Sequence, residues 1–254
     1  FVTDGMQSQE WTTIPVPSQW ELQGFGAYNY GREKPEQMAD EKGMYKYSFT
    51  VPASWKKKKI NIVFEGSMTD TEVKINGKSA GPIHQGSFYR FKFDISRLLN
   101  FGRENLLEVT VSKKSSNELV NAAERYADYW IFGGIFRPVY LEALPGEHIE
   151  RFALDAKASG DFYLEAYLKN IRSSNRLEAS IETLAGETVG SSMVVALQKN
   201  EEKAVLNGAF KNVETWSPEF PNLYRIHLKL YDGEELIHQV SDRFGFRTVE
   251  IKDR

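Results

Sequence analysis

The sequence predicts an all-β protein made of two successive β-sandwiches, and two observations support this fold class. Many short segments alternate between apolar and polar residues with a period of two, and few segments carry a long helical period. Asn76-Gly77, the strongest short signal for a β-hairpin, directly follows one such segment. Short strands at this spacing are typical of a sandwich or a jelly roll.

The first sandwich is predicted for residues 1–145, as a jelly roll. Apolar side chains share one face of the expected strands, at residues 45–51, 60–64, 73–75, 89–95 and 107–111. Two long stretches without strand periodicity interrupt them, residues 23–43 and 112–127, and the second has room for a short helix at 118–126. Long loops inside compact domains are uncommon and often functional, so both are candidate functional segments.

The second sandwich is predicted for residues 146–254, after a boundary at Leu144-Pro145-Gly146. The alternation restarts beyond this point, at residues 162–168, 177–181, 194–197, 204–206 and 224–230. About seven short strands in a segment of this length suit an immunoglobulin-like sandwich. The Cys–Trp–Cys signature of antibody domains is absent, because the chain has no cysteine.

Aromatic residues are concentrated between Tyr126 and Tyr140, around a Gly133-Gly134 pair. A segment this apolar needs a core around it, and glycines inside a strand-like pattern mark a bend, a bulge or a close backbone approach. We expect the chain to enter the core, bend at the two glycines and leave as a strand through Val139 and Leu141. Pro138 removes one ladder donor, so this last strand should lie at a sheet edge or begin after the bend.

Composition excludes several classes of function. A net charge of −3 and a pI near 5.9 give no electrostatic case for nucleic acid or for an anionic membrane. No apolar run approaches the roughly 18 residues of a membrane span. We expect no cofactor and no metal, because phosphate-loop, dinucleotide and nucleophile-elbow motifs are absent and the histidines lack metal-ligand spacing: His84, His148, His227 and His238.

The sequence does not fix the cellular compartment of the protein. The chain begins at Phe1 without a Met, as in a processed chain or an excised piece, and a signal peptide is one segment that processing removes. The absence of cysteine does not decide the matter, since a secreted protein need not use disulfides. The periplasm or the exterior of the cell is therefore favoured slightly over the cytoplasm.

The segment from Asp128 to Val139 is joined by other short motifs in a fixed order. They are Pro17-Ser-Gln-Trp-Glu21, Tyr45-x-Tyr-x-Phe49, Phe64-Glu-Gly66, Val73-x-Ile-Asn-Gly77, Asp94-Ile-Ser, Leu107-x-Val-x-Val111, Trp216-Ser-Pro-Glu-Phe-Pro-Asn-Leu-Tyr224 and Phe244-Gly-Phe-Arg-Thr-Val249. Together they resemble the first two domains of glycoside hydrolase family 2, the β-galactosidase, β-glucuronidase and β-mannosidase group. In that resemblance the last motif matches the closing strand of the second domain.

The resemblance implies a galactose-binding-like jelly roll, then an immunoglobulin-like domain, then a catalytic (β/α)₈ barrel that carries the two catalytic glutamates. The chain stops at Arg254, about where that barrel begins, so we expect no catalytic residue in it. It would then be the N-terminal, non-catalytic fragment of a retaining exo-β-glycosidase, β-galactosidase first. Its partners would be a β-glycoside or oligosaccharide substrate and the C-terminal barrel. The alternative is a free-standing carbohydrate-binding protein, because jelly rolls often serve as binding modules.

Two residues are candidate substrate contacts. In β-galactosidases of the family, an Asp at the position of Asp128 contacts the terminal sugar, and an Asn on an earlier loop does likewise; Asn29 is the nearest candidate here. A structural alternative pairs Asp128 with Arg125 or Arg137, or with backbone N–H groups at the bend. Trp130 lies inside the apolar run, so we expect it in the core rather than as a platform for a sugar.

Overall fold

The computed structural model describes residues 1–3, 10–34, 37 and 40–251. The chain folds as two compact units, Phe1–Ala143 (unit 1) and Leu144–Arg254 (unit 2), and each has its own hydrophobic core. Antiparallel sheets make up both units, which confirms the predicted all-β sandwich class. In the described part of the chain, no helix is long and apolar enough to cross a membrane.

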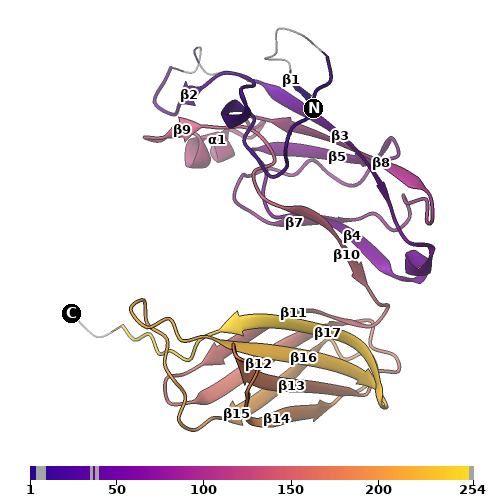
Figure 1. Cartoon of the computed structure of the whole chain (residues 1–254), viewed down its shortest axis with the longest axis vertical. Helices are drawn as coiled ribbons and strands as arrows, with labels where there is room; N and C mark the ends of the chain where they lie inside the picture. Colours follow the sequence, from indigo (N-terminus) through magenta and orange to yellow (C-terminus); the bar gives the residue numbers. More distant parts are fainter. Residues whose placement is uncertain (4–9, 35–36, 38–39, 252–254) are drawn as a thin grey trace. The chain divides into compact units, whose positions relative to one another are not determined.

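Unit 1 is a sandwich with a small ribbon and a short helix at one end (Figure 1). Its elements are β1 (Val2–Thr3), η1 (Glu21–Gln23), β2 (Asn29–Tyr30), β3 (Lys42–Thr50), η3 (Ala53–Lys57), β4 (Lys59–Phe64), β5 (Asp70–Ile75), β6 (Lys78–Ser79), β7 (Phe91–Asp94), β8 (Glu104–Ser112), α1 (Glu118–Glu124), β9 (Trp130–Ile131) and β10 (Val139–Leu144). The strand orders are β1-β3-β8-β5-β6 in one sheet and β10-β4-β7 in the other, and β2 pairs with β9.

Local signals account for much of unit 1. Asn76 and Gly77 have positive φ angles of 53° and 75°, as a two-residue hairpin turn requires, and β5 pairs with β6 across them. The predicted helix is α1, and the Asn117 side chain caps its first turn by accepting a hydrogen bond from the Leu119 N–H group. β10 begins immediately after Pro138 and is an edge strand, as the proline predicts.

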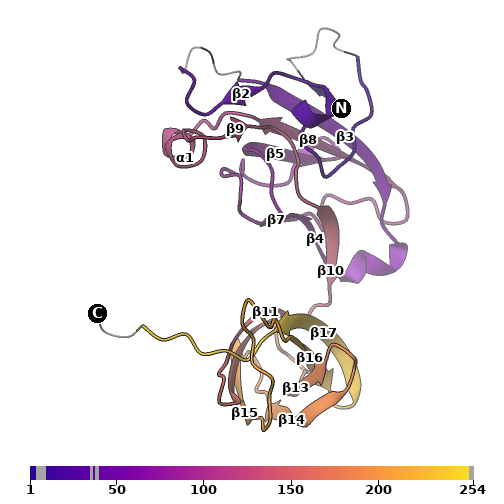
Figure 2. The ribbon, with the colours of Figure 1, turned by 60° about the vertical axis from the view of Figure 1, so that its left-hand side comes forward.

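Unit 2 is a sandwich whose two sheets face each other (Figure 2). Its strands are β11 (His148–Ala156), β12 (Asp161–Lys169), β13 (Arg176–Thr183), β14 (Thr188–Ala196), β15 (Lys203–Ala209), β16 (Tyr224–Asp232) and β17 (Glu235–Phe244). The orders β11-β12-β15 and β14-β13-β16-β17 enclose an apolar core that includes Leu164, Leu177 and Leu228.

The closing strand of unit 2 lies earlier than expected. β17 ends at Phe244, which is the first residue of the motif expected to form the closing strand. Beyond it, Phe246 makes an isolated bridge with Thr215 and its ring is fully buried. The motif therefore marks a buried anchor after the strand rather than the strand itself.

Candidate functional site

The elements α1, β2 and β9 lie together at one end of unit 1 (Figures 1 and 2), and both candidate residues belong to this group of elements. Asp128 lies between α1 and β9, and we call residues 126–132, which include β9, the Asp128 loop. Asn29 is the first residue of β2 and pairs with Ile131 of β9. The fold thus brings the two long loops of the sequence together, because the short β2–β9 ribbon connects them.

The Asp128 side chain is exposed. Among the described residues, its carboxylate makes no hydrogen bond or ion pair, and the two arginines of the structural alternative bind elsewhere. Arg125 donates to the carbonyl groups of Lys113 and Phe132. Arg137 donates to those of Glu65 and Phe88. The carboxylate is therefore available to a ligand.

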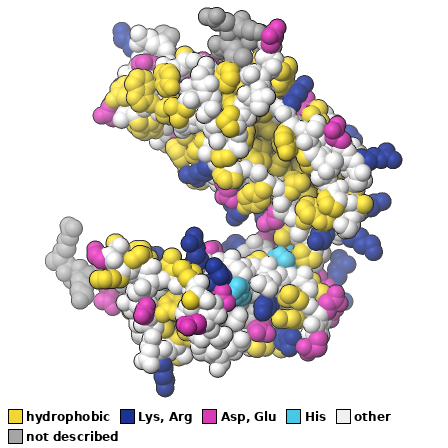
Figure 3. Space-filling model, in the orientation of Figure 1, with side chains coloured by type: hydrophobic (Ala, Val, Ile, Leu, Met, Phe, Trp, Pro, Cys, Tyr) yellow, Lys and Arg dark blue, Asp and Glu magenta, His cyan; other side chains and the backbone are white. Residues whose placement is uncertain are grey.

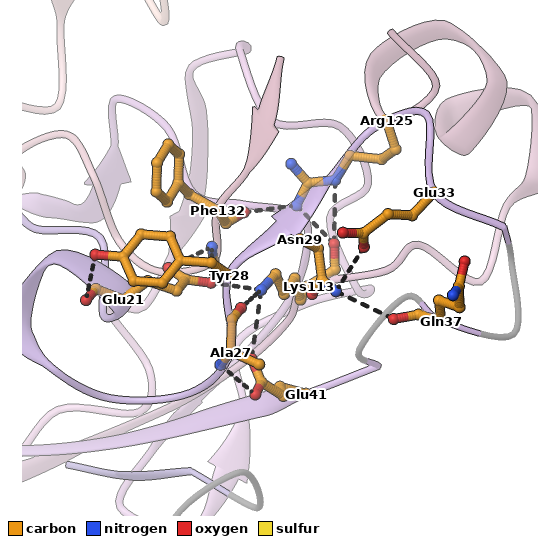
Figure 4. Close-up of polar contacts among 11 residues, drawn as sticks. Glu21, Ala27, Tyr28, Asn29, Glu33, Gln37, Glu41, Lys113, Arg125 and Phe132 are labelled. Atoms are coloured by element: carbon orange, nitrogen blue, oxygen red, sulfur yellow. Dashed lines mark hydrogen bonds and ion pairs between the residues drawn. The ribbon is translucent and has the colours of Figure 1, made fainter. Parts of the chain in front are cut away.

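Asn29 has a different environment, because only 5% of it is exposed. Its Nδ2 atom donates to Glu33 Oε2 at 3.1 Å and to the Gln37 carbonyl oxygen at 3.2 Å (Figure 4). These bonds tie the loop after β2 to the strand. In this conformation the Asn29 amide stabilises the ribbon beside Asp128 and faces inward.

The aromatic segment bends at its glycine pair, as predicted. A Cβ atom on Gly133 would lie 2.0 Å from Cζ2 of Trp20, and Gly134 has a φ angle of +122°. The first position therefore allows the backbone to lie against a buried indole ring, and the second adopts a conformation that favours glycine. The bend fixes the direction in which the chain leaves the Asp128 loop.

The expectation that Trp130 lies in the core is wrong. Trp130 is 55% exposed, and its ring contacts those of Tyr28 and Tyr30 at centroid distances of 6.1 and 5.5 Å. Hydrophobic side chains gather on the surface around β2 and β9 (Figure 3). The physical reason is that the two-residue ribbon stands outside the sandwich, whose core takes Ile135 and the fully buried Trp20 instead.

A buried ion network lies beneath the ribbon (Figure 4). Lys113 Nζ is 2.7 Å from Glu21 Oε1, donates to the Ala27 carbonyl oxygen at 2.5 Å, and lies 3.5 Å from Glu41 Oε2. The Glu21 carboxylate also accepts hydrogen bonds from the Gly133 N–H group at 3.0 and 3.1 Å. This single carboxylate thus joins the ion network to the glycine bend.

Burial changes the proton affinity of these groups. It raises the pKa of Glu21, although hydrogen bonds from Lys113 and the Gly133 N–H group oppose the rise. It lowers the pKa of Arg125 to about 10, because the guanidinium is desolvated, although the charges of Glu124 and Glu21 oppose the fall. Arg125 therefore remains a cation at neutral pH, buried next to the Lys113 carbonyl group that it binds.

Sequence reasoning missed this network, although one signal was present. Val109, Val111 and Lys113 continue one alternation, so the period of two places Lys113 on the inward face of β8 and its extension. Its positive charge argued against burial. Glu21 and Arg125 reach Lys113 through contacts distant in sequence, which the alternation within one strand does not predict.

Comparison with known protein families identifies both units. Residues 5–145 match the model described as "Glycosyl hydrolases family 2, sugar binding domain", and residues 148–247 match the model "Glycosyl hydrolases family 2". The chain belongs to glycoside hydrolase family 2. The resemblance found in its motifs is therefore confirmed over both units.

Curated family 2 relatives include a β-galactosidase from Clostridium acetobutylicum, 32% identical over 95% of this chain, and one from Thermoanaerobacter pseudethanolicus, 31% identical over 82% of it. The chain spans 28% of the length of each. Among solved structures, a β-glucuronidase from Bacteroides uniformis has a TM-score of 0.72 at 23% identity, with 96% of this chain and 30% of that one covered. This last match shows a shared fold.

Proposed function

We propose that this chain is the non-catalytic, two-sandwich part of a retaining exo-β-glycosidase, and that Asp128 contacts the terminal sugar of the substrate. The observation that carries the proposal is the exposed Asp128 carboxylate, held on an anchored loop and without a partner among the described residues. Such a group can be presented to a neighbouring pocket with little freedom of movement. Membership of family 2 and the length of the relatives support the rest of the assignment.

The preferred substrate class is a terminal β-galactoside, because both curated relatives described above are named β-galactosidases. The solved β-glucuronidase with the same fold makes a glucuronide the competing substrate. Asp128 suits either sugar, since a carboxylate accepts hydrogen bonds from hydroxyl groups common to both. Asn29 is the second proposed contact, although its buried amide makes Asp128 the stronger candidate.

The catalytic carboxylates are proposed to lie on a (β/α)₈ barrel elsewhere in the same polypeptide. The purified chain should therefore bind no substrate productively and release no p-nitrophenol from p-nitrophenyl β-glycosides. Turnover that persists through repurification and follows the protein peak would contradict this part of the proposal.

The role of Asp128 is tested by Asp128→Asn in the full-length polypeptide. A hydrogen bond between a carboxylate and a sugar hydroxyl contributes about 1.5–3 kcal/mol, so kcat/KM should fall by roughly ten- to a hundred-fold. The melting temperature should barely change, since the side chain is exposed and Asn keeps its shape. Asp155→Asn, at an exposed position of unit 2, is the control and should change neither quantity. A lower melting temperature with full activity per folded molecule would return Asp128 to a structural role.

A further inference from the structure

We propose that Arg125 is a positioning residue for Asp128: its buried guanidinium closes the neck of the Asp128 loop and thereby sets where the carboxylate points. The inference rests on the proposed function, in which Asp128 contacts a terminal sugar. It assigns to Arg125 an effect on saccharide recognition that is exerted entirely through Asp128.

The contacts of Arg125 join the two ends of the loop. Its Nε and Nη2 atoms donate to the Lys113 carbonyl oxygen at 3.1 and 2.6 Å, and Nη2 also donates to the Phe132 carbonyl oxygen at 2.9 Å (Figure 4). Arg125 immediately precedes the loop and Phe132 ends it, so one planar group spans the neck. Asp128 lies near the middle of the segment that this group closes.

The middle of the loop is fixed by β2 and the residue after it. The Gly31 N–H group donates to the Tyr129 carbonyl oxygen at 2.9 Å. A Cβ atom on Gly31 would lie 2.3 Å from the Ala127 carbonyl oxygen, so the two backbones are in close contact there. Gly31 therefore holds the residues on both sides of Asp128, and Arg125 closes the ends of the same loop.

The chain segment that precedes Arg125 is itself held in place by hydrogen bonds. Asp70, which is buried, accepts hydrogen bonds from the Ser115 hydroxyl at 2.6 Å and from the Ser116 N–H group at 2.8 Å. The Asn121 side chain, inside α1, makes two hydrogen bonds with the Ser115 backbone. The segment from β8 through α1 thus has a fixed position before the loop begins.

The burial of Arg125 argues for a geometric role. Only 4% of the residue is exposed, and no carboxylate among the described residues lies within ion-pair distance of its guanidinium. Burying a charge without an ion-pair partner is unfavourable, so a sandwich that needed only stability would be served better by an apolar side chain. A guanidinium offers what an apolar group lacks, a rigid fork of donors that reaches two carbonyl groups at once.

The test is a double-mutant cycle of Arg125→Lys and Asp128→Asn in the full-length polypeptide. Lysine keeps the charge but loses the planar fork. The assay uses the p-nitrophenyl β-glycoside that the wild-type enzyme turns over fastest, and hydrogen exchange reports the amides of residues 126–132. Arg137→Lys is the matched control, because Arg137 also donates to two carbonyl groups but lies away from the Asp128 loop.

We expect Arg125→Lys to lower kcat/KM by about tenfold, since small misplacements of a contact group have effects of this size. In the Asp128→Asn background the same change should have no further effect, and exchange in the loop should accelerate in Arg125→Lys but not in Arg137→Lys. If Arg125→Lys folds poorly, Gly31→Ala displaces the loop instead, because its Cβ atom would clash with the Ala127 carbonyl oxygen, and should show the same non-additivity.

Two other outcomes overturn the inference in distinguishable ways. Arg125 does not act through Asp128 if Asp128→Asn lowers kcat/KM and Arg125→Lys has no effect, or if the two effects multiply fully in the double mutant. In either case only the positioning role fails. If Asp128→Asn leaves kcat/KM unchanged, the proposed sugar contact fails, and the positioning role fails with it.

Discussion

In unit 1, charged side chains lie beneath the surface next to the segment that carries Asp128: Glu21, Glu41, Lys113 and Arg125 are all buried. In unit 2, the buried polar residues of the described part of the chain are His148 and Ser174. Its close ion pairs lie at the surface, as between Lys203 and Glu165, where 45% and 21% of the side chains are exposed.

We infer from this difference that the buried charges hold the Asp128 loop in position more than they stabilise the sandwich. Unit 2 shows that an apolar core suffices for this type of fold. A buried ion pair stabilises a protein little more than apolar residues of similar volume, and often less. Arg125 and Glu21 bond the backbone of Phe132 and Gly133, and Lys113 and Glu41 bond that of Ala27, which lies in the other long segment. We therefore infer that the buried charges have a geometric role, which is to hold these two segments and the glycine bend in one arrangement.

The largest expected difference between the units follows from removing one buried cation. Lys113→Met leaves the Glu21 carboxylate buried without its ion-pair partner, which should lower the free energy of unfolding by about 3–5 kcal/mol. Urea denaturation measures this change. Lys203→Met is the control in unit 2 and should leave the free energy of unfolding almost unchanged, because its ion pair is exposed. Equal effects of the two substitutions would remove the contrast between the units.

A somewhat smaller loss is expected where the glycine bend meets Trp20. Gly133→Val forces a side chain into an indole ring that is fully buried, so the free energy of unfolding should fall by about 3 kcal/mol. Gly146→Val is the matched control, since a Cβ atom there has no neighbour within 4 Å. Thermal melts that coincide for Gly133→Val and the wild type would refute the packing of the bend.

The smallest effect concerns the acid stability of unit 2. Burial alone would raise the pKa of Glu147, but hydrogen bonds from the backbone N–H groups of Arg172, Ser173 and Ser174 lower it to about 2. A carboxyl group with a lowered pKa stabilises the fold at pH values above its ordinary pKa of 4.5. This contribution disappears as the pH falls through about 2. Since Glu147 is largely solvated, only a modest shift is expected.

The measurement is the melting temperature of the wild type and of Glu147→Gln between pH 6 and pH 2. The wild type should be the more stable at pH 6. The difference should shrink toward pH 2, because protonation removes the same negative charge that the substitution removes. A difference that stays constant over this range would show that the carboxylate charge is not involved.

Local chemistry predicted the elements of unit 1 whose contacts are close in sequence, such as the Asn76-Gly77 turn and α1. The glycine pair also marked the bend at Gly133, although the contacts of that bend with Trp20 and Glu21 are distant in sequence. Local chemistry did not predict which tryptophan is buried, because Trp20 stands among polar neighbours and Trp130 in an apolar run, the reverse of their burial in the fold. β17 lacked a clear signal since it is an edge strand with mostly polar residues.

The candidate site was predictable only in part. The motif marked Asp128, and the sequence placed it beside a long loop. The contacts that hold Asp128 in place join residues that are distant in sequence, Glu21 with Gly133 and Arg125 with Lys113. Such contacts depend on which strands become neighbours, and alternation within a single strand carries no information about them.

The central claim, that unit 1 presents the Asp128 carboxylate to a hydroxyl group of the terminal sugar, is tested most directly with deoxy substrates. We would measure kcat/KM of the full-length wild type and Asp128→Asn on the preferred β-glycoside and on analogues that each lack one hydroxyl. Asp128→Asn should lose roughly ten- to a hundred-fold on the parent sugar. It should lose almost nothing on the one analogue whose missing hydroxyl is the partner of Asp128. The same loss on every analogue would contradict the claim, because the carboxylate would then contact no hydroxyl of that sugar.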